Sequence, residues 1–199
     1  MSINGPTSLR IEGYAIVSAD GMIADRDGHI PPELKIDADQ RFFGEGLEAA
    51  KLIVHGAHSH EQQANSDRRR RLVLTRKIAG LAQHPSLPNA MLWNPAGVAF
   101  ASACDAIGVV EGVVAVIGGT DVFGLFLTIG YDTFHLSRVA SALLPAGRPV
   151  FPGVPAYSPE AILARHGLTP GPVQLLDATA EATLVSWRRS HIALMTELS

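Results

Sequence analysis

Hydrophobic segments alternate with segments of helical pattern along most of the chain. Runs rich in Val, Ile and Leu predict strands at residues 9–18, 51–56, 71–75, 90–93, 112–119 and 132–140. Apolar residues spaced three or four apart predict helices at 37–50, 99–110 and 120–130, with a helical turn at 57–65. Two further alternating runs, 173–178 and 183–189, predict a C-terminal strand pair. We therefore expect an α/β fold with a mostly parallel central sheet of about eight strands, flanking helices and an antiparallel C-terminal edge.

Two segments interrupt this alternation. Residues 19–34 are rich in glycine, proline and acidic residues and predict a long loop after the first strand. Residues 144–159 predict an extended, proline-rich connection before the C-terminal pair. Because the sequence contains no internal repeat and no linker, we expect one domain over residues 1–199.

Composition excludes several classes of protein. The chain has 199 residues, 47% of them hydrophobic and 18% charged, with a formal net charge of −3. This balance argues against disorder and gives no reason to expect nucleic acid or membrane as a partner. The single cysteine, Cys104, excludes a disulfide framework within the chain. With no secretory signal at the start, we expect a cytoplasmic protein.

The strongest local motif is VIGGTDVF, where a buried strand is followed by Gly118, Gly119 and the start of a helix. Glycines let a ligand approach the backbone, and a helix N-terminus offers free N–H groups to an anion. The motif is neither G-x-G-x-x-G nor a P-loop, since Leu125 stands where a P-loop has lysine. A ligand-binding turn and a plain tight turn are both compatible with it.

Histidines and arginines give weaker signals. HGAHSHE holds His55, His58, His60 and Glu61, but nothing brings their side chains together, so we predict no metal. The arginine run 68–71 is typical of a solvated surface, whereas Arg76 directly follows a predicted strand, where ligands of α/β sheets collect. The candidate acids are Asp39 and Glu33, which lie near the start of the first helix.

Taken in order, five motifs resemble one superfamily. They are SADGMIADRDG, IVHGAHSHE, RRLVLTR, VIGGTDVFGLFL and DTFHLSRV followed by VFP. The series is similar to the dihydrofolate reductase superfamily, and the first motif is nearest to the riboflavin-pathway pyrimidine reductases. The resemblance runs from about residue 10 to residue 152.

The resemblance implies NADPH as the hydride donor and assigns residues to it. The implied cofactor-binding residues are Ile16, Ile23, Gly56, Ala57, His58, Ser59, Thr75, Arg76, Gly118, Gly119, Thr120, Asp121 and Val122. Thr75 and Arg76 correspond to the site of the adenosine 2′-phosphate, and Ile16 and Ile23 to the flanks of the nicotinamide. Asp39 and Ser137 correspond to the substrate side, as catalytic residues. The superfamily also implies a cis peptide bond between Gly118 and Gly119, and a trans bond there would weaken the case for a reductase.

Two departures from the superfamily pattern limit the choice of substrate. Ala57 replaces the arginine that usually follows Gly56, and the usual Pro-Trp before the first helix is absent. We therefore expect an NADPH-dependent reductase of a ribosylaminopyrimidine, with a true dihydrofolate reductase as the alternative. A non-catalytic nucleotide- or metal-binding module on the same fold is a third hypothesis. The partner is then a small pyrimidine or pterin, and a homodimer is a possible assembly.

Overall fold

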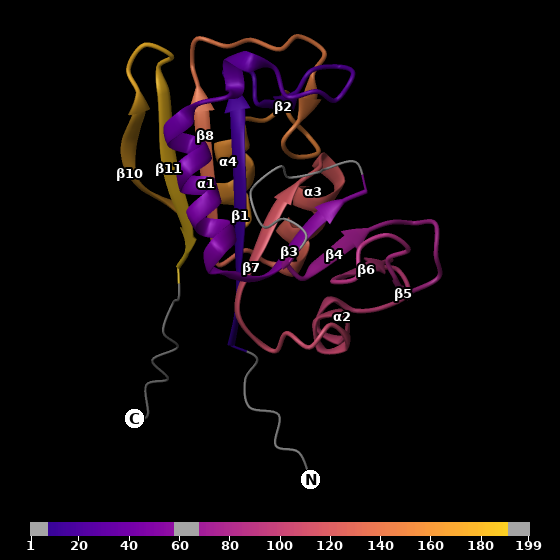
Figure 1. Cartoon of the computed structure of the whole chain (residues 1–199). Coiled ribbons are helices and arrows are strands. Elements are labelled where there is room, and N and C mark those ends of the chain that lie inside the picture. The colour runs from indigo at the N-terminus through magenta and orange to yellow at the C-terminus, as the bar shows by residue number, and fades with distance from the viewer. Residues whose placement is uncertain (1–7, 58–67, 191–199) are drawn as a thin grey trace, which may run out of the picture.

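A nine-stranded sheet forms the centre of the computed structural model, which describes residues 8–57 and 68–190 (Figure 1). In spatial order the strands are β10 (Leu168–Asp177), β11 (Ala182–Arg189), β8 (Thr133–Val139), β1 (Ser8–Ser18), β7 (Glu111–Gly118), β3 (Ala50–Gly56), β4 (Arg71–Leu74), β6 (Ala90–Trp93) and β5 (Leu81–Gln83). The six strands from β8 to β6 are parallel to one another. The remaining pairings, β8–β11–β10 and β6–β5, are antiparallel. The predicted fold class is confirmed.

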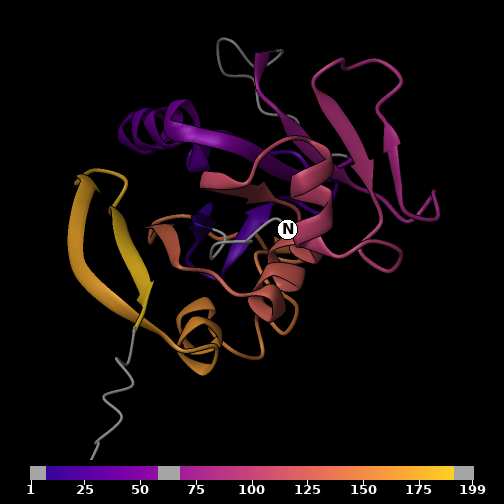
Figure 2. The same cartoon turned by 90° about the horizontal axis from the view of Figure 1, so that it is seen from below.

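Helices cover both faces of this sheet. Helix α1 (Asp37–Ala49) lies on one face, while α3 (Thr120–Ile129) and α4 (Pro159–Arg165) lie on the other (Figure 2). The larger core joins α3 and α4 with α2 (Phe100–Ala106), and it includes Trp93 and Phe126, both fully buried. Under α1 lies a smaller cluster around Tyr14 and Leu47. The strands between the helices are buried on both faces, which explains their continuous apolar runs.

Five short elements of the described chain were not expected from the sequence, and one of them is the edge strand β5. Strand β2 (Met22–Ala24) lies inside the predicted loop 19–34 and pairs with β9 (Arg148–Pro149), and a 3-10 turn spans Pro32–Leu34. Helix α4 follows the proline-rich segment, where Ser158 Oγ accepts a hydrogen bond from Ala161 N at 3.2 Å. Such a side-chain cap satisfies a helix-terminal N–H that would otherwise be unpaired. Most of the helical turn expected at 57–65 lies outside the described residues.

No helix within the described residues is long and apolar enough to cross a membrane. Cys104 lies buried on α2, and burial raises the pKa of its thiol to about 12. The thiol is therefore protonated at neutral pH and unreactive.

Candidate functional site

The parallel strands end along one edge of the sheet, and most of the predicted site residues lie there. Ile16 of β1 is the register partner of Ser137 of β8. Gly118 of β7 is the partner of His55 of β3. The next residue of β3, Gly56, is beside Leu74, the last residue of β4. Because parallel strands share a direction, these positions form a row at the carboxyl edge, where open α/β sheets bind ligands.

Asp39 and Ser137 are in direct contact, although 98 residues separate them in the sequence. Ser137 Oγ donates a hydrogen bond to Asp39 Oδ1 at 2.5 Å, and Ser137 is only 1% exposed. Asp39 reaches it from the first turn of α1. Glu33, the other candidate acid, is exposed on the 3-10 turn. The contact joins the two residues assigned to the substrate side.

Burial raises the pKa of the Asp39 carboxyl above its usual value of 3.8, and the hydrogen bond from Ser137 opposes this shift. Desolvation penalises the ionised form more than one hydroxyl stabilises it. A carboxyl in this state holds a proton more readily than an exposed one. It can therefore serve as a proton donor or as a hydrogen-bond anchor for a nitrogen heterocycle.

The turn from β7 into α3 is built from two glycines in left-handed backbone conformations. Gly118 has φ 145° and Gly119 has φ 82°, which other residues rarely adopt. Val154–Pro155 is the cis peptide bond among the described residues, so the expectation of a cis Gly118–Gly119 bond is wrong. The chain makes this sharp turn through the glycine dihedral angles, with a trans peptide between them.

The three predicted residues at the start of α3 are Thr120, Asp121 and Val122, and they differ in which of their groups can contact a ligand. The first intrahelical bond runs from Phe123 N to Gly119 O, so the amides of Thr120, Asp121 and Val122 precede the helical ladder. Thr120 Oγ1 donates to Pro149 O at 2.5 Å, which ties the helix start to β9. The Val122 side chain is 1% exposed in the core, so its backbone alone can meet a ligand.

Arg76 follows β4 and forms an ion pair with Asp121, at 3.1 Å between Nη2 and Oδ2. The two side chains are 80% and 64% exposed, so this pair contributes at most about 1 kcal/mol. Thr75 Oγ1 accepts a hydrogen bond from Lys77 N at 3.2 Å. The structure thus brings Arg76 to the N-terminus of α3, across the edge of the sheet.

The remaining predicted residues that the structure describes lie around the same edge. Ile16 is half-buried on β1 and packs beside the cluster that contains Val139. Ile23 lies on β2 and packs against the main core. Gly56 ends β3, and Ala57 follows it, exposed. The predicted positions His58 and Ser59 lie outside the described residues.

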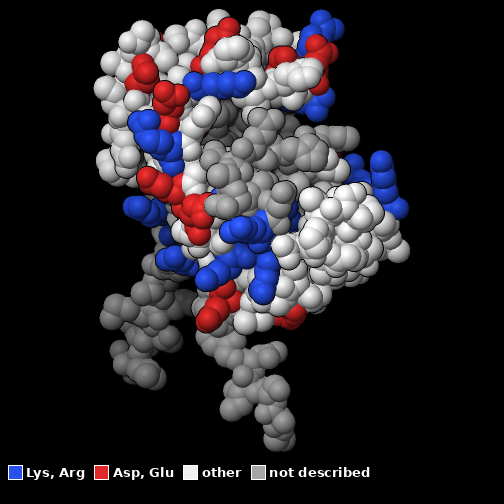
Figure 3. All heavy atoms as spheres, viewed as in Figure 1, with Lys and Arg blue, Asp and Glu red and all other residues white. Residues whose placement is uncertain are grey.

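Of the other groups that the sequence singled out, the arginine run lies away from this edge, and His55 lies buried next to Gly56. Residues 68–70 precede β4 and line a surface depression of about 490 Å³ with Lys51, at the amino end of the strands and away from the site edge. Figure 3, in the same view as Figure 1, shows Lys and Arg side chains gathered on the lower part of the molecule. His55 is buried, with Nδ1 2.8 Å from Gly56 O. Within the described ranges, no three His, Cys, Asp or Glu side chains gather as metal ligands.

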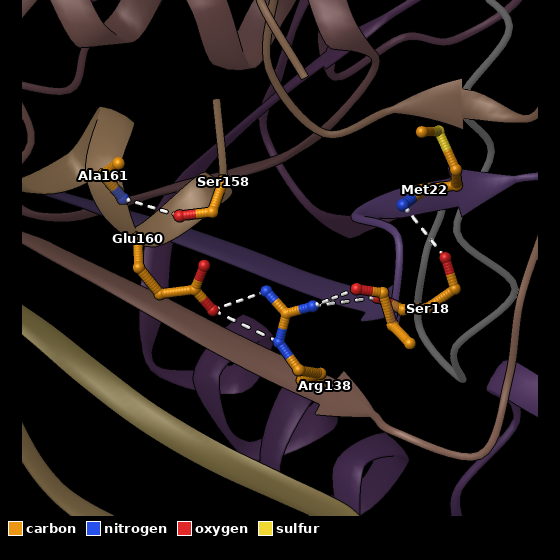
Figure 4. Close-up of polar contacts among 7 residues, drawn as sticks. Ser18, Met22, Arg138, Ser158, Glu160 and Ala161 are labelled. Carbon is orange, nitrogen blue, oxygen red and sulfur yellow. Dashed lines mark hydrogen bonds and ion pairs between the residues drawn. The ribbon is translucent and has the colours of Figure 1, made fainter. Parts of the chain in front are cut away.

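Sequence reasoning missed the residues that hold the loop after β1. Arg138 of β8 donates from Nη1 to Ser18 O at 3.2 Å and to Ala19 O at 2.7 Å (Figure 4). Its other edge contacts Glu160 of α4. Period-2 alternation along β8 places Arg138 on the face opposite Ser137, but nothing in the sequence names its partners.

Known structures resemble this arrangement, although no family model and no curated protein matches the sequence. A riboflavin biosynthesis protein from Shewanella sp. PV-4 superposes with a TM-score of 0.62 at 17% identity, over 91% of this chain and 99% of that one. Dihydrofolate reductase from Enterococcus faecalis complexed with NADP(H) gives 0.57 at 16% identity, over 91% and 96% of the two chains. The chain has the dihydrofolate reductase-like fold.

A larger enzyme shares this fold over part of its length. It is the diaminohydroxyphosphoribosylaminopyrimidine deaminase/5-amino-6-(5-phosphoribosylamino)uracil reductase from Thermotoga maritima. The TM-score is 0.61 at 18% identity, and the match covers 92% of this chain and 57% of that one. The present chain therefore corresponds to little more than half of the Thermotoga protein. At such low identities the likeness concerns the dihydrofolate reductase-like fold itself.

The raised pKa of Asp39 predicts how stability changes with pH. Below pH 3.8 the carboxyl is protonated in both the folded and the unfolded chain. As the pH rises through 3.8 and then through the higher folded pKa, the unfolded chain ionises first and the folded state loses stability. Asp39→Asn removes this loss, so the variant should gain stability relative to the wild type over that interval. Urea unfolding from pH 3 to 7 measures the difference, and a constant difference would contradict the assignment.

Proposed function

We propose that the chain is an NADPH-dependent reductase that transfers hydride to a ribosylaminopyrimidine-type substrate. The observation that carries the proposal is the partly buried Asp39–Ser137 contact beside Ile16, at the same sheet edge as the start of α3. It puts an acid with a raised pKa next to an apolar position. The names of the matched structures, a riboflavin biosynthesis protein and a pyrimidine reductase among them, support the substrate class.

The residues at this edge suit NADPH by their chemistry. Three amides at the start of α3 are suited to a diphosphate, because a helix N-terminus attracts anions. Gly118 and Gly119 leave the backbone bare where the nicotinamide would lie. The exposed guanidinium of Arg76 is suited to a 2′-phosphate, and its pair with Asp121 is weak enough for a phosphate to replace. Ala57 cannot supply the second guanidinium that the superfamily pattern has there.

The bound cofactor would supply a hydride, and residues of the chain would position the nicotinamide ring and supply the proton. Ile16 and Ile23 would form apolar walls that hold the ring at its reacting distance. Reduction of a C=N or C=C bond needs a proton as well as a hydride. The Asp39 carboxyl would hold that proton at Oδ and give it to the substrate nitrogen directly or through water, while Ser137 fixes its orientation.

A non-catalytic nucleotide-binding module is the second candidate. The trans peptide at Gly118–Gly119 favours it, because that peptide lacks the cis geometry expected from the superfamily motif. Ala57 favours it as well, since it removes a phosphate ligand. Such a module would bind NADPH without oxidising it.

We also propose that the chain forms a homodimer through the edge strand β10. The outer edge of β10 pairs with no other strand in the described part of the chain, and it exposes Val173 and Leu175, each 68% exposed. An exposed edge strand of this kind can pair with a second copy, which supports a homodimer. Analytical ultracentrifugation tests this, and a monomer at micromolar concentration would contradict it. A cytoplasmic location is inferred from the cysteine content.

Arg76 should set the preference for NADPH over NADH. Its guanidinium would pair with the 2′-phosphate that NADH lacks, and because the side chain is exposed we expect the lower end of the charge-assisted range, about tenfold in Kd. Arg76→Ala should therefore weaken NADPH binding by about tenfold and leave NADH binding nearly unchanged. Fluorescence titration with both cofactors measures this, with Lys77→Ala as the matched control. Equal weakening for both cofactors would show that Arg76 does not contact the 2′-phosphate.

The substrate assignment is tested by NADPH oxidation with two substrates in parallel. The wild type should oxidise NADPH with 5-amino-6-(5-phosphoribosylamino)uracil and far more slowly with dihydrofolate. Asp39→Asn should lower kcat by about 10²- to 10⁴-fold, the usual contribution of a positioned acid, while NADPH binding is retained. Faster turnover of dihydrofolate would favour the folate alternative. NADPH binding without turnover of either substrate would favour the non-catalytic module.

A further inference from the structure

The loop that follows β1 begins with a turn held by side chains from several elements. Ser18 Oγ accepts a hydrogen bond from Met22 N at 3.0 Å and donates one to Asp20 Oδ1 at 2.5 Å. The same carboxylate oxygen of Asp20 accepts from Leu144 N at 3.0 Å. Ser18 and Asp20, at the start of the SADGMIADRDG motif, therefore shape this turn and set where β2 begins.

Arg138 holds the backbone of this turn from outside the loop. Nη1 donates to the carbonyl oxygens of both Ser18 and Ala19. On its other edge, Nε and Nη2 donate to Glu160 Oε1 at 3.2 and 2.5 Å. Figure 4 shows the guanidinium lying between the helix and the turn, with contacts on both sides. The side chains of Arg138 and Glu160 are only 24% and 36% exposed, so water screens their attraction less than that of a surface ion pair.

Glu160 fixes the direction of the guanidinium. It lies in the first turn of α4, which Ser158 caps. Two hydrogen bonds to one carboxylate oxygen hold the planar fork, which leaves Nη1 facing the carbonyls. Without Glu160 the side chain could rotate away from the turn, because arginine has several free torsions.

A continuous set of contacts leads from this point to the proposed cofactor edge. The turn held by Arg138 leads into β2, which carries Ile23 and pairs with β9. Pro149 of β9 accepts the hydrogen bond from Thr120, the first residue of α3. The anchor is thus connected to an apolar wall of the proposed site and to its anion-binding helix.

We propose that Arg138 is a positioning residue for hydride transfer. Glu160 orients the Arg138 guanidinium, and Arg138 holds Ile23 and the start of the loop in place against β1. This inference rests on the proposed reductase function for its catalytic part. Its structural part, that the Arg138–Glu160 pair fixes residues 19–34, stands on the observed contacts. Arg138 would act through the loop and would touch neither substrate nor cofactor.

The experiment combines hydrogen exchange with steady-state kinetics on the full chain. Glu160→Gln and Arg138→Met should each speed amide exchange in peptides from residues 19–34 by about tenfold, the equivalent of one charge-assisted hydrogen bond. Exchange in β7 should stay unchanged. Both variants should lower kcat for NADPH oxidation by more than they raise KM for NADPH. The control is Arg165→Gln, which changes a cation on the same helix that contacts Tyr157 and not the loop.

A charge reversal separates positioning from simple stabilisation. The double variant Arg138→Glu with Glu160→Arg keeps an ion pair between β8 and α4, but a carboxylate at position 138 cannot donate to the carbonyls of Ser18 and Ala19. We expect it to recover thermal stability without recovering loop protection or kcat. Recovery of loop protection and kcat in the double variant, or unchanged loop exchange in Glu160→Gln, would overturn the proposal. Faster loop exchange in a chain that never oxidises NADPH would support the anchor and refute the reductase function.

Discussion

The parallel pairing of β1 with β7 on one side and β8 on the other determines where everything else in this protein lies. β1 is the central strand between them, with Gly13 beside Val116 and Ile16 beside Ser137. Because side chains alternate along a strand, a shift of one residue in either register would turn the row of β1 side chains to the opposite face. The carboxyl ends of the neighbouring strands would then no longer present the proposed site residues together.

The site at this edge combines an apolar wall, a partly buried acid and one exposed guanidinium. Asp39 is held by Ser137 in surroundings that raise its pKa, whereas the Arg76–Asp121 pair is exposed and weak. The two ends therefore suit different tasks: proton chemistry at the buried end and recognition of an anion at the exposed end. The turn at Gly118–Gly119 joins them with a bare backbone, and it does so with a trans peptide.

The elements that the sequence predicts well are those with long, regular signals. The apolar run of β7 and the amphipathic pattern of α1 identify both elements to within about two residues of the observed ends. Helix α4 was missed because a proline-rich segment precedes it, although Ser158-Pro159 is a favourable start for a helix. Strand β2 is too short for a periodic signal, and its pairing with β9 depends on residues more than a hundred positions away.

The residues of the site also differ in how well the sequence predicts them. The contact between Asp39 and Ser137 spans 98 positions, so only the resemblance to a known superfamily could suggest that both belong to one site. The roles of Arg138 and Glu160 had no sequence signal, because each looks like an ordinary charged residue until the fold brings them to the same turn. The cis peptide was expected only because the superfamily motif has one. In the structure, the positive φ angles of Gly118 and Gly119 form this turn with a trans peptide.

The proposed function places NADPH along the carboxyl edge of the sheet, from Arg76 to Asp39. A crystal structure of the chain soaked with NADP⁺ tests this most directly. We expect the 2′-phosphate within hydrogen-bond distance of Arg76, the diphosphate at the N-terminus of α3, and the nicotinamide against Ile16 and Ile23. Cofactor bound at another face, or no bound cofactor at millimolar concentration, would contradict this placement of NADPH.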